Sequence, residues 1–437
     1  MTTTVMKTKA ERAIPEQFEA VAATLPGGAD VRRAREQAIA SFKTLGLPHR
    51  RIEEWKYTDL RSSLKEAFVP APKSSIAVSN DALSSALGPF AAINCARLVF
   101  VDGHHAPALS TSAGLSGVHV STAAERAGDH HLATPALSAR NAVAALNVAF
   151  ASDGAVVDVP ASTSLDRPLM LVFLSTATVA STVTTRCFIT IGKKAAATLI
   201  EVHAQIGSSA VQANAATELT IGDGATVDHV KVVLGAQNGV HLSNWDVKVG
   251  ANALYRAAQL TPSAGLARND VRISLDGRDS TFDFAGIALG RNTDHIDTTM
   301  EINHLAPGCQ SRELFKTVID GRARTVFQGK VYVAQAAQKT DGKQMAQALM
   351  LSPDAEFDSK PELEIYADDV ACGHGSTCAE IDPALIFYCQ SRGIPEAQAR
   401  ALLIESFVGD AIEKIDNPAI RRAMSEVALG WLAAKSA

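Results

Sequence analysis

The stretch "IGKKAAATLIEV", which begins at Ile191, decides the fold because it recurs along the middle of the chain. Looser copies are "IGDGATVDHV" at Ile221, "VGANALYRAA" at Val249, "LDGRDSTFDF" at Leu275 and "IDGRARTVFQ" at Ile319. Each copy has an apolar residue, a Gly or Asp turn, a small residue and then a new strand. The first four copies start 30, 28 and 26 residues apart, and the fifth follows after 44, which predicts an insertion.

This repeat predicts a mostly β solenoid. Each unit has too few apolar residues to close a core of its own, so neighbouring units must stack. From Gly154 onward, short strands such as "LMLVFL" and "RCFITI" follow one another, and no helix of ordinary length intervenes until about Pro383. We therefore predict a parallel β-helix core with two or three short strands per coil. A stacked β-sandwich is the alternative that the degenerate repeat leaves open.

Helical segments flank the strands. "ADVRRAREQAIASFKTLG" has apolar residues at helical spacing and ends at Gly46, which suits a C-cap. Near the other end, Asp382 and Pro383 are typical of an N-cap and a first helical position, and two more amphipathic helices follow. These last helices could cap the solenoid or bind a partner. The predicted domains are a mainly helical segment 1–154, a β-helix core 155–378 and a helical segment 379–437.

Composition is that of an ordinary soluble protein, with 47% hydrophobic residues and a net charge of −5. This charge gives no reason to expect nucleic acid or an anionic membrane as partner. The first residues lack an apolar leader, and no 18-residue apolar run occurs, so we expect a cytoplasmic protein. Six cysteines are too few for a disulfide framework. Cys309, near His304 in "NHLAPGCQ", looks like an exposed loop thiol.

Catalytic motifs are scarce. The chain has no GxxxxGK[ST] phosphate loop, so it does not hydrolyse nucleotides by that route, and it has no HExxH, CxxC or GxSxG. The main enzyme alternative is a β-solenoid carbohydrate-active enzyme whose aspartates line one groove. Aspartates at turns, where they hydrogen-bond the local backbone, are the competing explanation. The aspartates concerned are Asp270, Asp276, Asp279, Asp283, Asp294 and Asp297.

The stretch "DDVACGHGSTCAEID" places Cys372, His374 and Cys378 within seven residues. Thiolate and imidazole are ligands that suit zinc, ferrous iron and iron–sulfur clusters, and alternate positions share one face of a strand. However, C-x-H-x3-C matches no standard closed site, and Gly373 and Gly375 would allow the backbone to turn there. From the residues alone, a metal or cluster contact and a corner with buried thiols both remain open.

Several long stretches carry a resemblance to a known family. They are "EEWKYTDL" (53–60), "NHLAPGCQSRELFKTVIDGRARTVFQGKVYVAQAAQKTDGKQ" (303–344), "KPELEIYADDVACGHGSTCAEID" (360–382) and "IFYCQSRGI" (386–394), followed by "ESFVGDAIEKI". With them, the sequence resembles the SufB/SufD family of the Suf iron–sulfur cluster assembly machinery. It is more similar to the SufD branch, because His374 precedes Gly375 where SufB typically has His-Glu, and because the chain has few cysteines.

The resemblance implies a right-handed parallel β-helix between helical domains, and a non-catalytic scaffold role. It implies pairing with SufB through the β-helix and binding of the SufC ATPase through the C-terminal helices, with a homodimer as an option for the isolated chain. No cofactor is expected to be bound permanently. A transient iron ion or iron–sulfur cluster would be shared with SufB, and the family's histidine corresponds to His374, with Cys372 two residues before it. His374 is thus the candidate iron ligand, and Cys372 the second candidate contact.

Overall fold

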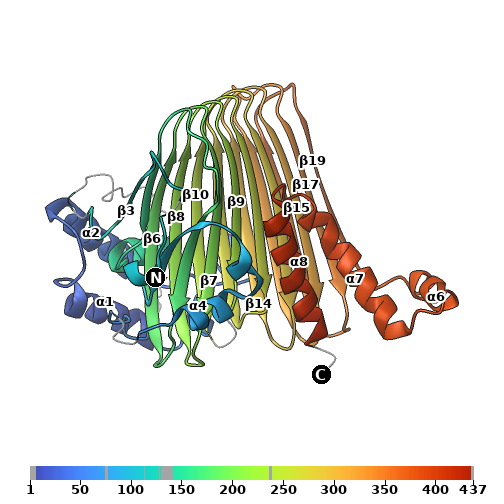
Figure 1. The fold of residues 1–437 in the computed structure, drawn as a ribbon, viewed down its shortest axis with the longest axis horizontal. Coiled ribbons are helices and arrows are strands. Elements are labelled where there is room, and N and C mark those ends of the chain that lie inside the picture. Colours follow the sequence, from blue (N-terminus) through green and yellow to red (C-terminus); the bar gives the residue numbers. More distant parts are fainter. Residues whose placement is uncertain are drawn as a thin grey trace, which may run out of the picture.

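The computed structural model describes residues 6–73, 77–112, 114–126, 128, 141–235 and 239–434. Within these residues, a long two-sheet solenoid forms the body of the molecule (Figure 1). The ten-stranded sheet consists, in spatial order, of β19 (Ala371–Ala379), β17 (Asp341–Met350), β15 (Gln310–Ile319), β13 (Thr281–Gly290), β11 (Leu254–Pro262), β9 (Thr226–Val233), β7 (Ala196–Gln205), β5 (Leu169–Ser175), β1 (Ala96–Val101) and β2 (His104–His105).

The facing sheet has nine strands among the described residues. In spatial order they are β18 (Glu356–Ile365), β16 (Arg324–Val333), β14 (His295–His304), β12 (Leu266–Leu275), β10 (Val240–Val249), β8 (Val211–Ile221), β6 (Ser181–Ile191), β4 (Ala155–Val159) and β3 (His119–Thr122). From β4 onward the chain alternates between the sheets, and these strands stack in parallel into about eight coils. The predicted mostly β fold with a parallel β-helix core is confirmed, with two strands per coil.

The strand register shows where the repeat was interpreted correctly and where it was not. Ile191, Ile221, Val249 and Leu275 stack directly on one another in the nine-stranded sheet, as the first four copies predict. Leu275 then pairs with His304, only 29 residues later. The predicted insertion is therefore wrong, because the fifth copy ends β15 in the opposite sheet. Similar turn chemistry occurs at the corners of both sheets, so sequence similarity alone could not separate them.

The core lies between the two sheets and is built from inward-facing alternate residues. Aromatic rings stack along the coils, as with Tyr255 and Phe282, whose centroids lie 5.4 Å apart. Coil corners approach one another closely. At Gly277 an added Cβ would lie 1.9 Å from the backbone nitrogen of Ala251, so only glycine fits there.

N-terminal helices cover part of the outer face of the nine-stranded sheet, and a short strap holds them there. In the strap, η1 (Glu53–Trp55) buries Trp55, and the Arg268 guanidinium lies 3.9 Å from the centre of its ring. Arg268 also donates to the Glu54 carbonyl at 2.7 Å and pairs with buried Asp297. The helices are α1 (Lys9–Val21), α2 (Ala29–Leu45), α3 (Leu60–Ser63) and α5 (Ala142–Phe150), whereas α4 (Asn80–Leu87), η2 (Gly88–Ala92) and η3 (Pro107–Leu109) lie by the ten-stranded sheet.

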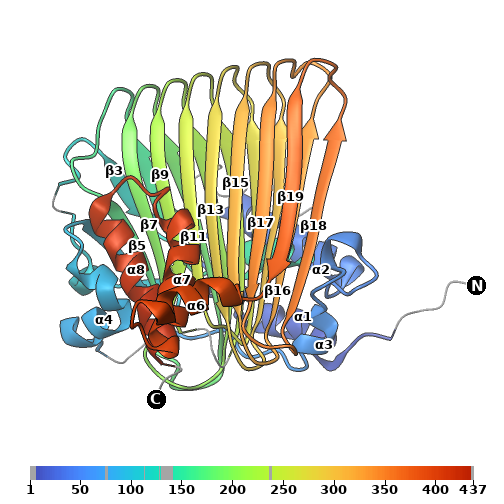
Figure 2. The same ribbon diagram turned by 90° about the vertical axis from the view of Figure 1, so that its right-hand side faces the viewer.

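The C-terminal helices are α6 (Pro383–Ser391), α7 (Glu396–Ile412) and α8 (Pro418–Ala433). Helices α7 and α8 pack on the outer face of the ten-stranded sheet, opposite the N-terminal helices (Figure 2). Helix α6 projects away from the body (Figure 1) and buries only Ile386. None of the described helices has the length and apolarity needed to cross a bilayer. The proposed division at 154 and 378 remains a prediction, since β1–β3 extend the sheets from the N-terminal segment.

Candidate functional site

The last coil of the solenoid is open. Strand β18 pairs only with β16, and β19 only with β17, so each leaves one edge without a neighbour in the described chain. Phe357, Leu363 and Val370 from this coil pack against the core but stay partly exposed. Unpaired strand edges next to exposed apolar side chains are templates for pairing with another chain. The open end is therefore a candidate interface.

Cys372 and His374 lie on β19, at the rim of this open end. The strand runs without a break from Ala371 to Ala379, so the two glycines do not disturb the alternation of side chains. Cys372 pairs in register with Gly342, and His374 with Gln344. Both Gly342 and Gln344 are buried on the inward side of β17, so Cys372 and His374 also lie on the inward side. Cys372 is half-buried, whereas His374 is exposed.

Cys378 is not part of the same group. It is exposed and four residues beyond His374 on a continuous strand, which places the two about 13 Å apart along the strand. Among the described residues, no group of three His, Cys, Asp or Glu side chains is arranged to hold a metal ion. Cys372 and His374 therefore do not make up a metal site by themselves within the part of the chain that the structure describes.

The thiol of Cys372 is held in its protonated form by its surroundings. Burial raises its pKa, and the nearby carboxyl groups of Asp341 and Glu313 raise it further, against the backbone N–H of Gly342, which lowers it. A thiol becomes a good metal ligand only as the thiolate. In the isolated chain, Cys372 is a poor ligand until a cation or a partner changes this environment.

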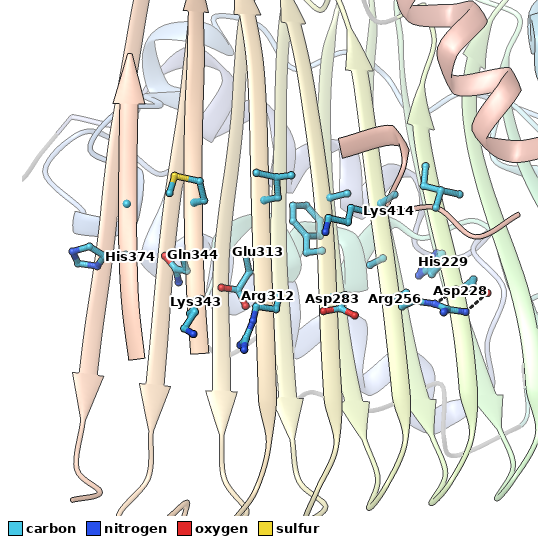
Figure 3. Close-up of a pocket in the computed structure, with 18 of the residues that line it drawn as sticks. Asp228, His229, Arg256, Asp283, Arg312, Glu313, Lys343, Gln344, His374 and Lys414 are labelled. Atoms are coloured by element: carbon cyan, nitrogen blue, oxygen red, sulfur yellow. Dashed lines mark hydrogen bonds and ion pairs between the residues drawn. The ribbon is translucent and has the colours of Figure 1, made fainter. Parts of the chain in front are cut away.

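Two polar side chains continue inward from His374. Glu313 on β15, Gln344 on β17 and His374 on β19 are consecutive in register (Figure 3). Glu313 and Gln344 are each only 3% exposed, and neither makes a side-chain hydrogen bond that meets ordinary geometry. Burial raises the pKa of Glu313 to about 8, against smaller opposing effects of Ser311 and Arg312. The sequence reasoning missed this row, although a charged residue two positions before an inward Phe315 in "RELFK" was a usable signal.

A groove of 680 Å³ crosses the same strands near the connection between α7 and α8. Its charged residues alternate in sign along the register from Asp228 through Arg256 and Asp283 to Arg312, and the next position, Lys343, is again positive (Figure 3). Lys414 contributes a further positive charge from the α7–α8 connection. The groove thus presents mixed charge, and the ion pair between Arg256 and Asp416 links the α7–α8 connection to the sheet.

The aspartates of the carbohydrate-enzyme alternative do not form one groove. Asp297 is fully buried and paired with Arg268, and Asp283 lies in the other sheet. Asp270 is on β12, whereas Asp276, Asp279 and Asp294 lie outside the strands, as expected for turn residues. The exposed-thiol interpretation of Cys309 is also wrong, because this side chain is fully buried and its Sγ lies 3.2 Å from Ser280 Oγ.

Taken together, these features define a parallel β-solenoid with helical ends and with two candidate site residues, Cys372 and His374, at its open end. Comparison with known proteins gives the family. The model of the SUF system FeS cluster assembly SufBD core domain matches residues 173–407, and that of the SufBD protein N-terminal region matches residues 28–171. The chain belongs to the SufBD family, and the predicted resemblance is confirmed. This membership gives it a role in iron–sulfur cluster assembly.

Relatives in several bacteria agree. The chain is 30% identical over 398 residues to an iron–sulfur cluster assembly SufBD family protein of Synechocystis, which covers 87% of this chain and 86% of that protein. It is 29% identical over 390 residues to the iron–sulfur cluster assembly protein SufD of Escherichia coli, with 89% and 90% covered. The protein of the same name from Bacillus subtilis is 25% identical over 289 residues, with 65% of each chain covered.

Proposed function

We propose that the chain is a non-catalytic scaffold subunit of an iron–sulfur cluster assembly complex. It pairs through its open solenoid end with a SufB-type paralogue and binds a SufC-type ATPase through its C-terminal helices. The observation that carries this proposal is the open last coil, where two unpaired strand edges flank the inward-facing Cys372 and His374. A site with two candidate ligands at an interface is suited to completion by a second chain.

The solenoid interface follows from the edges of β18 and β19. A partner strand added to these edges would satisfy their free backbone groups and cover the apolar side chains beneath. Tyr366, which directly follows β18, is 60% exposed, and neighbouring Ile365 is also exposed. A second copy of the chain could use the same edges when no paralogue is available.

The ATPase interface follows from α6. In this nine-residue helix, Leu385, Phe387 and Tyr388 are exposed, and the exposed fraction of Phe387 reaches 72%. Large aromatic and aliphatic side chains gathered on one projecting helix are typical of a docking element. Because α6 contributes little to the core, its apolar surface is explained better by a partner than by the fold.

The contacts between the helices and the sheet would transmit motion of the ATPase. Lys316 on β15 donates to Asp410 on α7 at 2.9 Å and lies 4.3 Å from the centre of the Phe407 ring. Arg256 on β11 pairs with Asp416 in the α7–α8 connection. Nucleotide-driven closure of the ATPase subunits would therefore pull on the ten-stranded sheet and shear the paired solenoids, which opens their interface.

At that interface, His374 would contact iron or the forming cluster, and Cys372 would be the second contact. A neutral imidazole is a good iron ligand, and the exposed position of His374 on β19 leaves its ring accessible to the cargo. Iron and the cluster are cargo here. No cofactor is proposed to stay bound to this chain, and ATP hydrolysis is assigned to the partner.

Co-purification of the tagged chain from its own cells tests this proposal. The wild-type chain should carry both an ABC-type ATPase and a β-helical paralogue. Phe387→Asp should lose the ATPase and keep the paralogue, while Arg422→Ala, a change at an exposed position of α8, should keep both. Recovery of the wild-type chain alone under gentle conditions would contradict the proposal.

A further inference from the structure

Two buried glutamates of the ten-stranded sheet differ strongly in their hydrogen-bond partners. Glu201, deep in the solenoid, accepts a hydrogen bond from Thr217 Oγ1 at 2.7 Å, pairs with His229 Nε2 at 3.0 Å and accepts from Trp245 Nε1 at 3.3 Å. Glu313, four coils closer to the open end, makes no hydrogen bond of ordinary geometry at either carboxyl oxygen, although the nearby Ser311 hydroxyl lowers its pKa slightly. A buried, unpartnered carboxyl group costs free energy, so its retention requires a specific explanation.

More polar groups without partners surround Glu313. Both polar side-chain atoms of Gln344 on the next coil are buried and unpartnered, and so is Nδ1 of His304, whose Nε2 contacts Ser311 Oγ at 3.1 Å. These groups belong to β14, β15 and β17, so they come from both sheets. They form a polar compartment in an interior that is otherwise mainly apolar at this level.

Two glycines border this compartment. A Cβ at Gly329 would lie 2.6 Å from Gln344 Oε1, so the amide occupies the volume that any other residue would fill. At Gly342, an added Cβ would come within 3.4 Å of Ser311 Oγ and 3.6 Å of His304 Nε2. Glycine on both sheets thus lets these polar side chains lie closer to the backbone than a Cβ would allow.

We propose that Glu313 and Gln344 form an inner holding site for a divalent metal ion, behind the His374 rim. Carboxylate and amide oxygens are ligands for hard and borderline divalent cations. Within the proposed function, on which this inference rests for its cargo, the ion is ferrous iron. No three His, Cys, Asp or Glu side chains of the described residues are arranged around one point, so water would complete the shell and the site would hold the ion weakly.

The register supplies the route to this site. Glu313, Gln344 and His374 occupy neighbouring strands of one sheet, and strands lie about 4.8 Å apart, so His374 is about 10 Å from Glu313 along the sheet. An ion bound at the exposed rim would pass Gln344 before it reaches Glu313. Arg312 and Lys343 lie at the alternate positions of the same strands and face outward, so they do not occupy the compartment, although the charge of Arg312 still lowers the pKa of Glu313 slightly.

Binding of ferrous iron to the full-length chain under anaerobic conditions tests the site. Equilibrium dialysis with ferrous ammonium sulfate should show saturable binding that weakens at least about tenfold in Glu313→Gln. Gln344→Leu should weaken it as well. Glu364→Gln, which removes a carboxylate at the surface of the same end, should bind as the wild type does.

The iron-binding experiment can fail or succeed independently of the co-purification experiment that tests the proposed function. Equal binding by wild type and Glu313→Gln, or no saturable binding by a folded wild-type chain, overturns the inner site whatever the chain pairs with. Loss of the ATPase and the paralogue in co-purification would overturn the proposed function and leave the iron-binding result intact. Thermal melting of each variant shows that the chain is folded, and if Glu313→Gln does not fold, Gln344→Leu decides the question.

Discussion

Replacing Glu313 with glutamine should change how the stability of the metal-free chain depends on pH. Burial raises the pKa of Glu313 to about 8, whereas an exposed glutamate in the unfolded chain titrates near 4.5. Between these values, the folded chain keeps a proton that the unfolded chain has released. The contribution of Glu313 to stability is therefore fully present below about pH 4.5, and it is lost as the pH rises through about 8. Glutamine keeps the shape and has no proton to lose.

The size of the effect follows from the two pKa values. They differ by about 3.5, and each pKa unit corresponds to about 1.4 kcal/mol, so the wild type loses about 5 kcal/mol of unfolding free energy across this window relative to Glu313→Gln. The whole loss of unfolding free energy comes from the folded state, because the carboxyl group has its ordinary pKa in the unfolded chain. The advantage of the variant should therefore grow from about pH 5 to about pH 8 and then level off.

Urea denaturation, followed by far-ultraviolet circular dichroism at a series of pH values with a chelator present, measures this difference. Glu364→Gln serves as the surface control and should run parallel to the wild type. A difference between wild type and Glu313→Gln that stays constant with pH would refute the reasoning, because Glu313 would then titrate alike in both states.

Three further predictions concern the frame and the open end. Trp55→Ala should lower the unfolding free energy by about 3–5 kcal/mol, because the strap loses its buried anchor, while the exposed Lys56→Ala should have little effect; similar melting curves would contradict the anchoring role. Gly277→Ala should destabilise the chain by about 3 kcal/mol through backbone overlap, whereas Gly409→Ala, which has open space in α7, should stabilise it by about 1 kcal/mol; thermal melting checks both signs. Cys378 should react quickly with a maleimide in the isolated chain and at least about tenfold more slowly in the assembled complex, so equal rates would argue against docking at β19.

The solenoid architecture could be predicted from the sequence because the repeat specifies coils that stack on one another. Turn residues at Ile191, Ile221 and Val249 marked real coil corners, and helix signals such as Asp382 and Pro383 marked the start of α6. The fifth copy at Ile319 was assigned to the wrong sheet, since corners of both sheets use similar residues. The periodicity therefore predicted that the chain coils. It did not predict at which of the two corners of a coil each copy of the repeat lies.

The candidate site was predicted only at its rim. Residue types in "CGHG" indicated Cys372 and His374. Glu313 and Gln344 are 28 to 61 residues away in the sequence and come near them only through the strand register. The burial of Cys309 could not be inferred either, because the preceding Pro307 and Gly308 are typical of an exposed loop, whereas the Cys309 side chain points into the core. Contacts between coils depend on the register of neighbouring strands, and this register cannot be predicted from a single sequence.

The most direct test of the central claim is cluster production in cells that carry His374→Ala in place of the wild-type chain. We predict that the variant still assembles with the paralogue and the ATPase, and that the activity of iron–sulfur enzymes supplied by this system falls at least about tenfold. His374→Ala cells with an intact complex and wild-type enzyme activity would contradict it.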